Sequence, residues 1–165
     1  MKKLILITFV FISASYILQA QIVTDRPDVT ESSSVIPKNS FQIESGMILQ
    51  KSGEDQFSPM NVYAPSALFR YGISKHFELR FFTQYQNDFS FGYYSFPYIN
   101  SGFNDIEIGT KVQLFKREGS RTEIAFLTHL LIPTGAESFT NAEYVSINKL
   151  AASHGITDYL GVGYN

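Results

Sequence analysis

The sequence predicts an all-β protein, an antiparallel up-and-down transmembrane β-barrel, and three observations support this prediction. After residue 40 the chain alternates apolar and polar residues with a period of two, which is typical of strands with two different faces. The alternating runs have about 9–11 residues, the length with which a tilted strand crosses a membrane. Short and long connections alternate between them, as in barrels with tight periplasmic turns and longer external loops.

Seven runs are expected as strands: 41–50, 63–73, 77–86, 105–114, 122–134, 145–154 and 159–165. In the first four, one face is apolar, and the other carries mainly polar or charged residues and glycines, together with Ile48, Leu68 and Phe82. The fifth is apolar on both faces in its middle, and the sixth is a weaker run. In the seventh, glycines alternate with Leu160, Val162 and Tyr164.

The connections predict the orientation of the strands. Short polar links at 74–76, 116–121 and 156–158 alternate with longer segments at 52–60, 87–104 and 135–144. This places the N-terminus in the periplasm, with the first strand running outward. Seven is an odd number, whereas bacterial single-chain barrels normally have an even one. We therefore expect the sequence to stop before the barrel closes and the chain to form an open, curled sheet.

The N-terminus predicts export from the cytoplasm. Lys2 and Lys3 precede an apolar stretch at 4–14, and Ala20 offers a small residue at a cleavage point, as in a secretory signal peptide. The alternative, a membrane anchor, would need a longer apolar stretch of about 20 residues. We expect a signal peptide at 1–20, a periplasmic leader or plug at 21–39, and at 40–165 an outer-membrane barrel that is incomplete at its C-terminus.

Composition narrows the classes of function. The 165 residues include 15 Phe and 10 Tyr but no Cys, which excludes disulfide and zinc–thiolate frameworks. A net charge of −2 makes nucleic acid an unexpected partner. No phosphate-binding glycine loop or nucleophile elbow occurs, and the spacing of His76, His129 and His154 matches no metal motif. We therefore expect neither an enzyme nor a cofactor or metal.

Several motifs resemble one family of outer-membrane proteins. They are TDRPDVTES at 24–32, VIPK at 35–38, FQIESG at 41–46, FRYGI at 69–73, ELR at 78–80, GFNDI at 102–106, GTK at 109–111 and LIPTG at 131–135. Together they resemble the MetA-pathway phenol-degradation family, whose members in Bacteroidetes-type bacteria are often labelled transporters. The resemblance implies an outer-membrane barrel that passes or binds small, including aromatic, solutes. Members of the family continue beyond the segment similar to residues 151–158.

Charged side chains on the polar faces are the first candidate site. They are Arg70, Glu78, Arg80, Asp105, Glu107 and Lys111. If the polar faces line a lumen, these residues form a wall that orients an anionic or phenolic solute. The alternative is a structural network, because small barrels are commonly filled by their own side chains.

Two further segments are candidates. Asp25, Arg26 and Asp28 precede the first strand and could fold into the lumen as a plug, with Arg26 near Glu44, Glu78 or Glu107, or form a solvated leader. The 87–104 segment is rich in aromatics that could stack on a ring-shaped solute, namely Phe91, Tyr93, Tyr94 and Phe96. Alternatively, this segment is an extended hairpin packed on itself or an anchor in the outer leaflet.

The pattern leaves three hypotheses for function. The first is passive transport or binding of small solutes, with outer-membrane lipid as the other partner. The second is a structural or adhesive barrel without transport. The third is a secreted soluble β-sandwich or lipocalin-like binder, because such a fold has the same alternation with its apolar face turned inward.

Overall fold

The computed structural model describes residues 24–25, 31–54, 58–90, 98–116 and 119–165. These residues form eight strands and no helix: β1 (Phe41–Lys51), β2 (Met60–Ser74), β3 (Phe77–Ser90), β4 (Tyr98–Phe103), β5 (Ile106–Lys116), β6 (Thr122–Ile132), β7 (Val145–Gly155) and β8 (Gly161–Tyr164). No helix capable of crossing a membrane occurs in these ranges. The predicted signal peptide at 1–20 lies outside the described residues.

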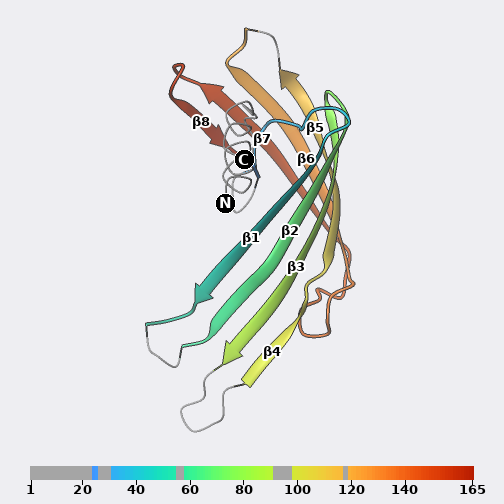
Figure 1. The fold of residues 1–165 in the computed structure, drawn as a ribbon, viewed down its shortest axis with the longest axis vertical. Helices are drawn as coiled ribbons and strands as arrows, with labels where there is room; N and C mark the ends of the chain where they lie inside the picture. The colour runs from blue at the N-terminus through green and yellow to red at the C-terminus, as the bar shows by residue number, and fades with distance from the viewer. Residues whose placement is uncertain (1–23, 26–30, 55–57, 91–97, 117–118) are drawn as a thin grey trace, which may run out of the picture.

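All strands belong to one antiparallel sheet that curls into an open half-barrel (Figure 1). The strand order is β1-β2-β3-β5-β6-β7-β8, so each strand pairs with its neighbour in sequence. The strand β4 is the exception, because it pairs with Tyr85–Ser90 of β3 while β5 pairs with Phe77–Phe82 of the same strand. The strands β4 and β5 thus lie end to end and count as one interrupted strand, which confirms the predicted open sheet of seven strands.

The boundaries differ from prediction at the end of β3. Residues 87–104 were expected as a loop, but β3 continues to Ser90 and pairs with β4, with Asp88 opposite Asn100 and Phe89 opposite Ile99. The loop prediction for 87–90 and 98–103 is therefore wrong, because cross-strand pairing overrides the low strand propensity of Asn and Asp. The described part of this segment is an extended hairpin, the alternative considered above.

The two faces of the sheet have opposite character, as the alternation predicts. On the concave face, alternate residues of the central strands are buried, and these include Leu68, Arg70, Glu78, Arg80 and Lys111. The residues between them point outward and are mainly apolar. The convex face therefore leaves large apolar side chains uncovered, while charged side chains are buried on the concave face.

Candidate functional site

Three cations lie together on the concave face because of the strand register. Arg70 of β2 is opposite Arg80 of β3, and Glu78 of β3 is opposite Lys111 of β5. All four side chains are at most 2% exposed. Three buried cations this close together are stable only if carboxylates compensate for their charge.

Arg70 of β2 binds two glutamates, one from each of the neighbouring strands β1 and β3. Its Nε and Nη2 each donate to a carboxylate oxygen of Glu78 at 2.9 Å, which is the bidentate geometry typical of strong guanidinium–carboxylate pairs. Its Nη1 donates to Oε1 of Glu44 on β1 at 2.8 Å. Arg70 therefore ties β1, β2 and β3 together across the concave face.

Asp25 supplies the third carboxylate from outside the sheet. Its Oδ2 accepts hydrogen bonds from Arg80 Nη1 at 2.6 Å and from Lys111 Nζ at 2.5 Å, and it lies 3.4 Å from Arg70 Nη1. Burial acts to raise the pKa of the Asp25 carboxyl, but the nearby charges of Lys111, Arg80 and Arg70 outweigh it and hold this pKa well below its usual value. Asp25 is thus an ionised carboxylate with no solvent exposure.

We call this group the ion cluster. Within the described chain it contains three cations and three carboxylates, all buried: Arg70, Arg80, Lys111, Asp25, Glu44 and Glu78. The formal charges balance. Glu31, which is partly exposed, adds a 2.6 Å contact to Nη2 of Arg80 at the edge of the cluster.

The residues before β1 cross the concave face from β1 to β7. The backbone N–H of Ile36 donates to Glu78 at 2.9 Å, and the carbonyl oxygen of Ser33 accepts from Gln113 of β5 at 2.9 Å. The hydroxyl groups of Ser33 and Ser153 of β7 are 2.7 Å apart. From here on, the leader means residues 24–25 and 31–40, which are the described part of the predicted 21–39 segment together with Ser40. The polar groups of the leader thus form hydrogen bonds with side chains on the concave face.

Gly72 allows the leader to lie directly on β2. The N–H of Asn39 donates to the carbonyl of Gly72 at 2.7 Å, and the N–H of Gly72 donates to the carbonyl of Ser40 at 3.0 Å. A Cβ atom at position 72 would overlap the Pro37 carbonyl and lie 2.9 Å from the oxygen of Ile36. Only glycine permits this approach of two backbones.

Gly72→Ala is expected to lift the leader from β2 and to destabilise the folded protein by about 1–3 kcal/mol, the usual cost of overpacking. Chemical unfolding in detergent micelles, together with the rate of proteolysis within the leader, measures both effects. Gly163→Ala in β8 is the matched control, because its nearest contact would be an ordinary 3.8 Å to the oxygen of Ala152. Equal stability and equal cleavage rates in the two variants would contradict the prediction.

Asp105 lies apart from the ion cluster. It occupies the break between β4 and β5, where its Oδ1 accepts the N–H groups of Thr134 at 3.0 Å and Gly135 at 2.9 Å. Its Oδ2 accepts the N–H of Asn141 at 2.8 Å. The structure thus places this predicted site residue where it fastens the connection between β6 and β7.

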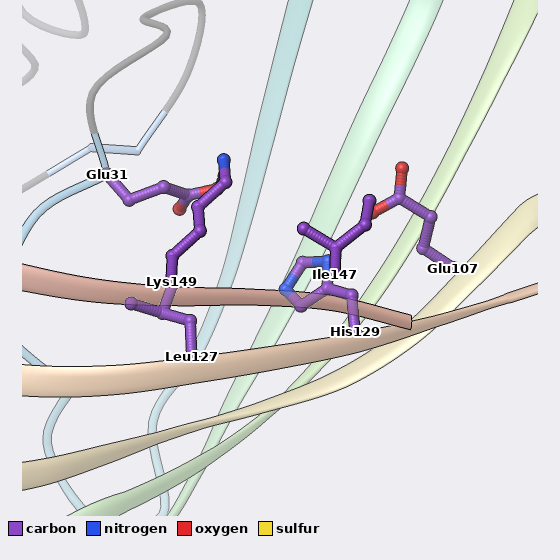
Figure 2. Close-up of a pocket in the computed structure, with 6 residues that line it drawn as sticks. All are labelled: Glu31, Glu107, Leu127, His129, Ile147 and Lys149. Carbon is purple, nitrogen blue, oxygen red and sulfur yellow. Dashed lines mark hydrogen bonds and ion pairs between the residues drawn. The ribbon is translucent and has the colours of Figure 1, made fainter. Parts of the chain in front are cut away.

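Glu107 also lies apart from the cluster and pairs with a histidine. Nδ1 of His129, from β6, is 2.7 Å from Oε2 of Glu107. The two side chains line a cavity of about 120 Å³ together with Glu31, Leu127, Ile147 and Lys149 (Figure 2). In Figure 2, Lys149 points toward Glu31 at one end, while His129, Ile147 and Glu107 gather at the other. The spacing of the histidines along the sequence did not predict this pair. The alternation of residues could have indicated that Glu107 and His129 point to the same face of the sheet.

Several predicted site residues fall where the structure gives no description. These are Arg26 and Asp28 of the suggested plug and Phe91, Tyr93, Tyr94 and Phe96 of the aromatic segment. Their predicted roles stay predictions. Of the suggested plug, the described residue is Asp25, and it lies on the concave face.

Comparison with known proteins identifies the family. A sequence profile of the family described as "Putative MetA-pathway of phenol degradation" matches residues 24–159, which include the leader and the strands from β1 to β7. Neither the curated proteins nor the solved structures contain a significant match to the chain. The matched region covers most of the sequence, and the chain belongs to this phenol-degradation family, as its motifs predicted.

Proposed function

We propose that the protein resides in the outer membrane and passes or binds small solutes, with aromatic compounds as candidates. The observation that carries this proposal is the distribution of polarity over the sheet. A water-soluble sheet protein buries its apolar face and exposes its charged face. Here the charged side chains are buried and the apolar ones are exposed, which is the arrangement expected of a barrel wall in lipid.

One apolar row on the convex face illustrates this arrangement. It crosses five strands in register, through Ile43, Phe69, Phe81, Ile108 and Leu130. Ile43 is 58% exposed and Ile108 is 48% exposed. Rings on adjacent strands add further apolar area, with the centroids of Phe69 and Phe81 5.8 Å apart. A contiguous exposed apolar surface of this kind is typical of a membrane or interaction surface.

The concave face supports a division of roles among the predicted site residues. Arg70, Glu78, Arg80 and Lys111 bind the leader and one another, which favours the structural alternative for these four. Glu107 instead borders a cavity and is the candidate that contacts a solute. The described leader covers part of the concave face, as the plug alternative expects, and the cavity bordered by Glu107 and His129 is left beside it.

The occupied concave face also favours a second candidate function. A barrel whose interior is filled by its own leader could have a structural or adhesive role without passing solutes. Both candidates place the convex face in lipid, so they differ in whether the protein passes or binds solutes.

Two measurements test the proposal. First, the protein is expected to stay in the membrane fraction after alkaline carbonate extraction and to require detergent for purification. Release into water as a monomer would contradict the membrane location and would favour the soluble sandwich. Second, liposomes containing the protein are expected to take up small neutral solutes faster than empty liposomes. Retention in the membrane without faster uptake would favour the structural or adhesive barrel.

A further inference from the structure

We propose that the cavity beside His129 is a binding site for a small neutral solute that carries a hydroxyl group. The hydroxyl would donate its hydrogen bond to Nε2 of His129, and the hydrocarbon part would contact Leu127 and Ile147. This inference rests on the proposed function, because it names the class of solute and its place on the concave face.

The unpartnered nitrogen of His129 is the main observation. The His129 side chain is 10% exposed, and no described residue forms a hydrogen bond with its buried Nε2. The other ring nitrogen is 2.7 Å from Glu107. An ionised carboxylate can only accept, so Nδ1 carries the proton and, in the neutral ring, Nε2 presents a lone pair. A buried acceptor without a partner is costly, and a ligand hydroxyl would remove this cost.

The backbone around His129 holds the ring in place. His129 on β6 lies opposite Gly109 on β5. A Cβ atom at position 109 would lie 2.8 Å from Cγ of the imidazole and 2.6 Å from the carbonyl oxygen of Thr128. The glycine therefore makes room for the ring against β5, while Glu107 fixes its orientation. A site whose polar group is already positioned loses less entropy when a ligand binds.

The remaining lining residues define the size and polarity of the ligand. Leu127, which is 2% exposed, and Ile147 are the apolar lining residues, whereas the other four are polar or charged. At the far end, Nζ of Lys149 is 3.6 Å from Oε1 of Glu31. The volume of about 120 Å³ is somewhat smaller than an apolar cavity of about 150 Å³ that accepts benzene. Because the cavity is open on one side, it admits a ligand of about one ring only if part of that ligand extends out of it.

The charges around the cavity favour a neutral ligand. Among the described lining residues, the carboxylates of Glu31 and Glu107 outnumber the single ammonium of Lys149. Glu31 already pairs with Lys149 at 3.6 Å and with Arg80 at 2.6 Å, and Lys149 is therefore not a free partner for an anion. A cation would compete with Lys149 and Arg80 for Glu31. A neutral hydroxyl compound satisfies Nε2 without adding charge.

Nuclear magnetic resonance of the histidine ring nitrogens provides a direct test. The full chain is labelled with ¹⁵N-histidine and purified in detergent micelles. We expect phenol to shift the Nε2 resonance of His129 saturably, whereas anisole, which has the same ring without a hydroxyl donor, does not. His129→Leu is expected to weaken phenol binding about tenfold, the equivalent of one buried hydrogen bond. His76→Leu is the matched control, because His76 lies in the exposed turn between β2 and β3 and should not affect binding.

Three results would overturn the site: equal shifts with anisole, tighter binding of benzoate than of phenol, or unchanged affinity in His129→Leu. The comparison of phenol with anisole needs only the unaltered protein, so it holds even if a variant fails to fold. Membrane retention and liposome uptake are measured separately. A protein that passes both of those tests but does not bind phenol at His129 refutes this site alone, whereas release by carbonate refutes the proposed function.

Discussion

Asp25→Asn is expected to destabilise the folded protein by about 3–5 kcal/mol, the usual cost of removing one partner from a buried ion pair. The substitution leaves three buried cations with two buried carboxylates and removes the charge that faces Arg80 and Lys111. Urea unfolding in detergent micelles, followed by tyrosine fluorescence, measures the change in free energy of unfolding. Cleavage within the leader should also become faster, because Asp25 anchors it to the sheet.

A surface pair provides the control for this effect. Asp158 is 2.9 Å from Arg121, but the two side chains are 80% and 53% exposed. Asp158→Asn should therefore change the free energy of unfolding by no more than about 1 kcal/mol. If Asp25→Asn changed the free energy of unfolding as little as Asp158→Asn, the ion cluster would not be what holds the leader against the sheet.

Acid should reduce the contribution of Asp25 in a defined direction. The pKa of its carboxyl is lower in the folded chain than the unfolded value of about 3.9, so the unfolded chain binds the proton first as the pH falls. The stabilisation is therefore complete at neutral pH and decreases below about pH 4. The difference in stability between the unaltered protein and Asp25→Asn should be constant from about pH 5 to 8 and become smaller in stronger acid.

Ile108→Arg is expected to destabilise the protein in lipid vesicles by about 2–4 kcal/mol, the cost of an arginine on the lipid face near the bilayer midplane. Ile108 lies on the convex face of β5, between Phe81 and Leu130 of the apolar row. If the same face were in water, an arginine at a position 48% exposed would change stability by no more than about 0.5 kcal/mol. Folding equilibria in vesicles distinguish these two values.

Tyr159→Arg is the matched control for this substitution. Tyr159 is fully exposed in the short connection between β7 and β8, outside any strand. Arginine is expected to be tolerated there, because charges near the interface cost about 0–1 kcal/mol. Equal and small effects at positions 108 and 159 would mean that lipid does not cover the convex face.

The alternation of residues predicted the strands and their two faces, because successive side chains of a strand point to opposite faces whatever the sheet packs against. It placed Arg70, Glu78, Arg80 and Lys111 on one face, and the structure buries all four there. The continuation of β3 to Ser90 was missed, since its polar residues are typical of loops and only pairing with β4 favours a strand.

Contacts between distant segments were harder to predict. Asp25 reaches Arg80 and Lys111 across separations of 55 and 86 residues, and no local pattern identifies such partners. The pairing of His129 with Glu107 required the register of β5 and β6, in which Gly109 faces the imidazole. The alternation specifies the face of a side chain, but the partner depends on strand register and on the path of the leader.

Spin labels can measure whether the convex face contacts lipid. The chain contains no cysteine, so single cysteines can be introduced and labelled at each position from 106 to 114 in vesicles. We predict that labels at the even-numbered, outward positions collide more often with oxygen, which dissolves in lipid, than with a water-soluble nickel complex. Labels at odd-numbered positions should be shielded from oxygen. A higher collision rate with the nickel complex at Ile108 and its even-numbered neighbours would show that this face meets water, and would contradict the membrane orientation.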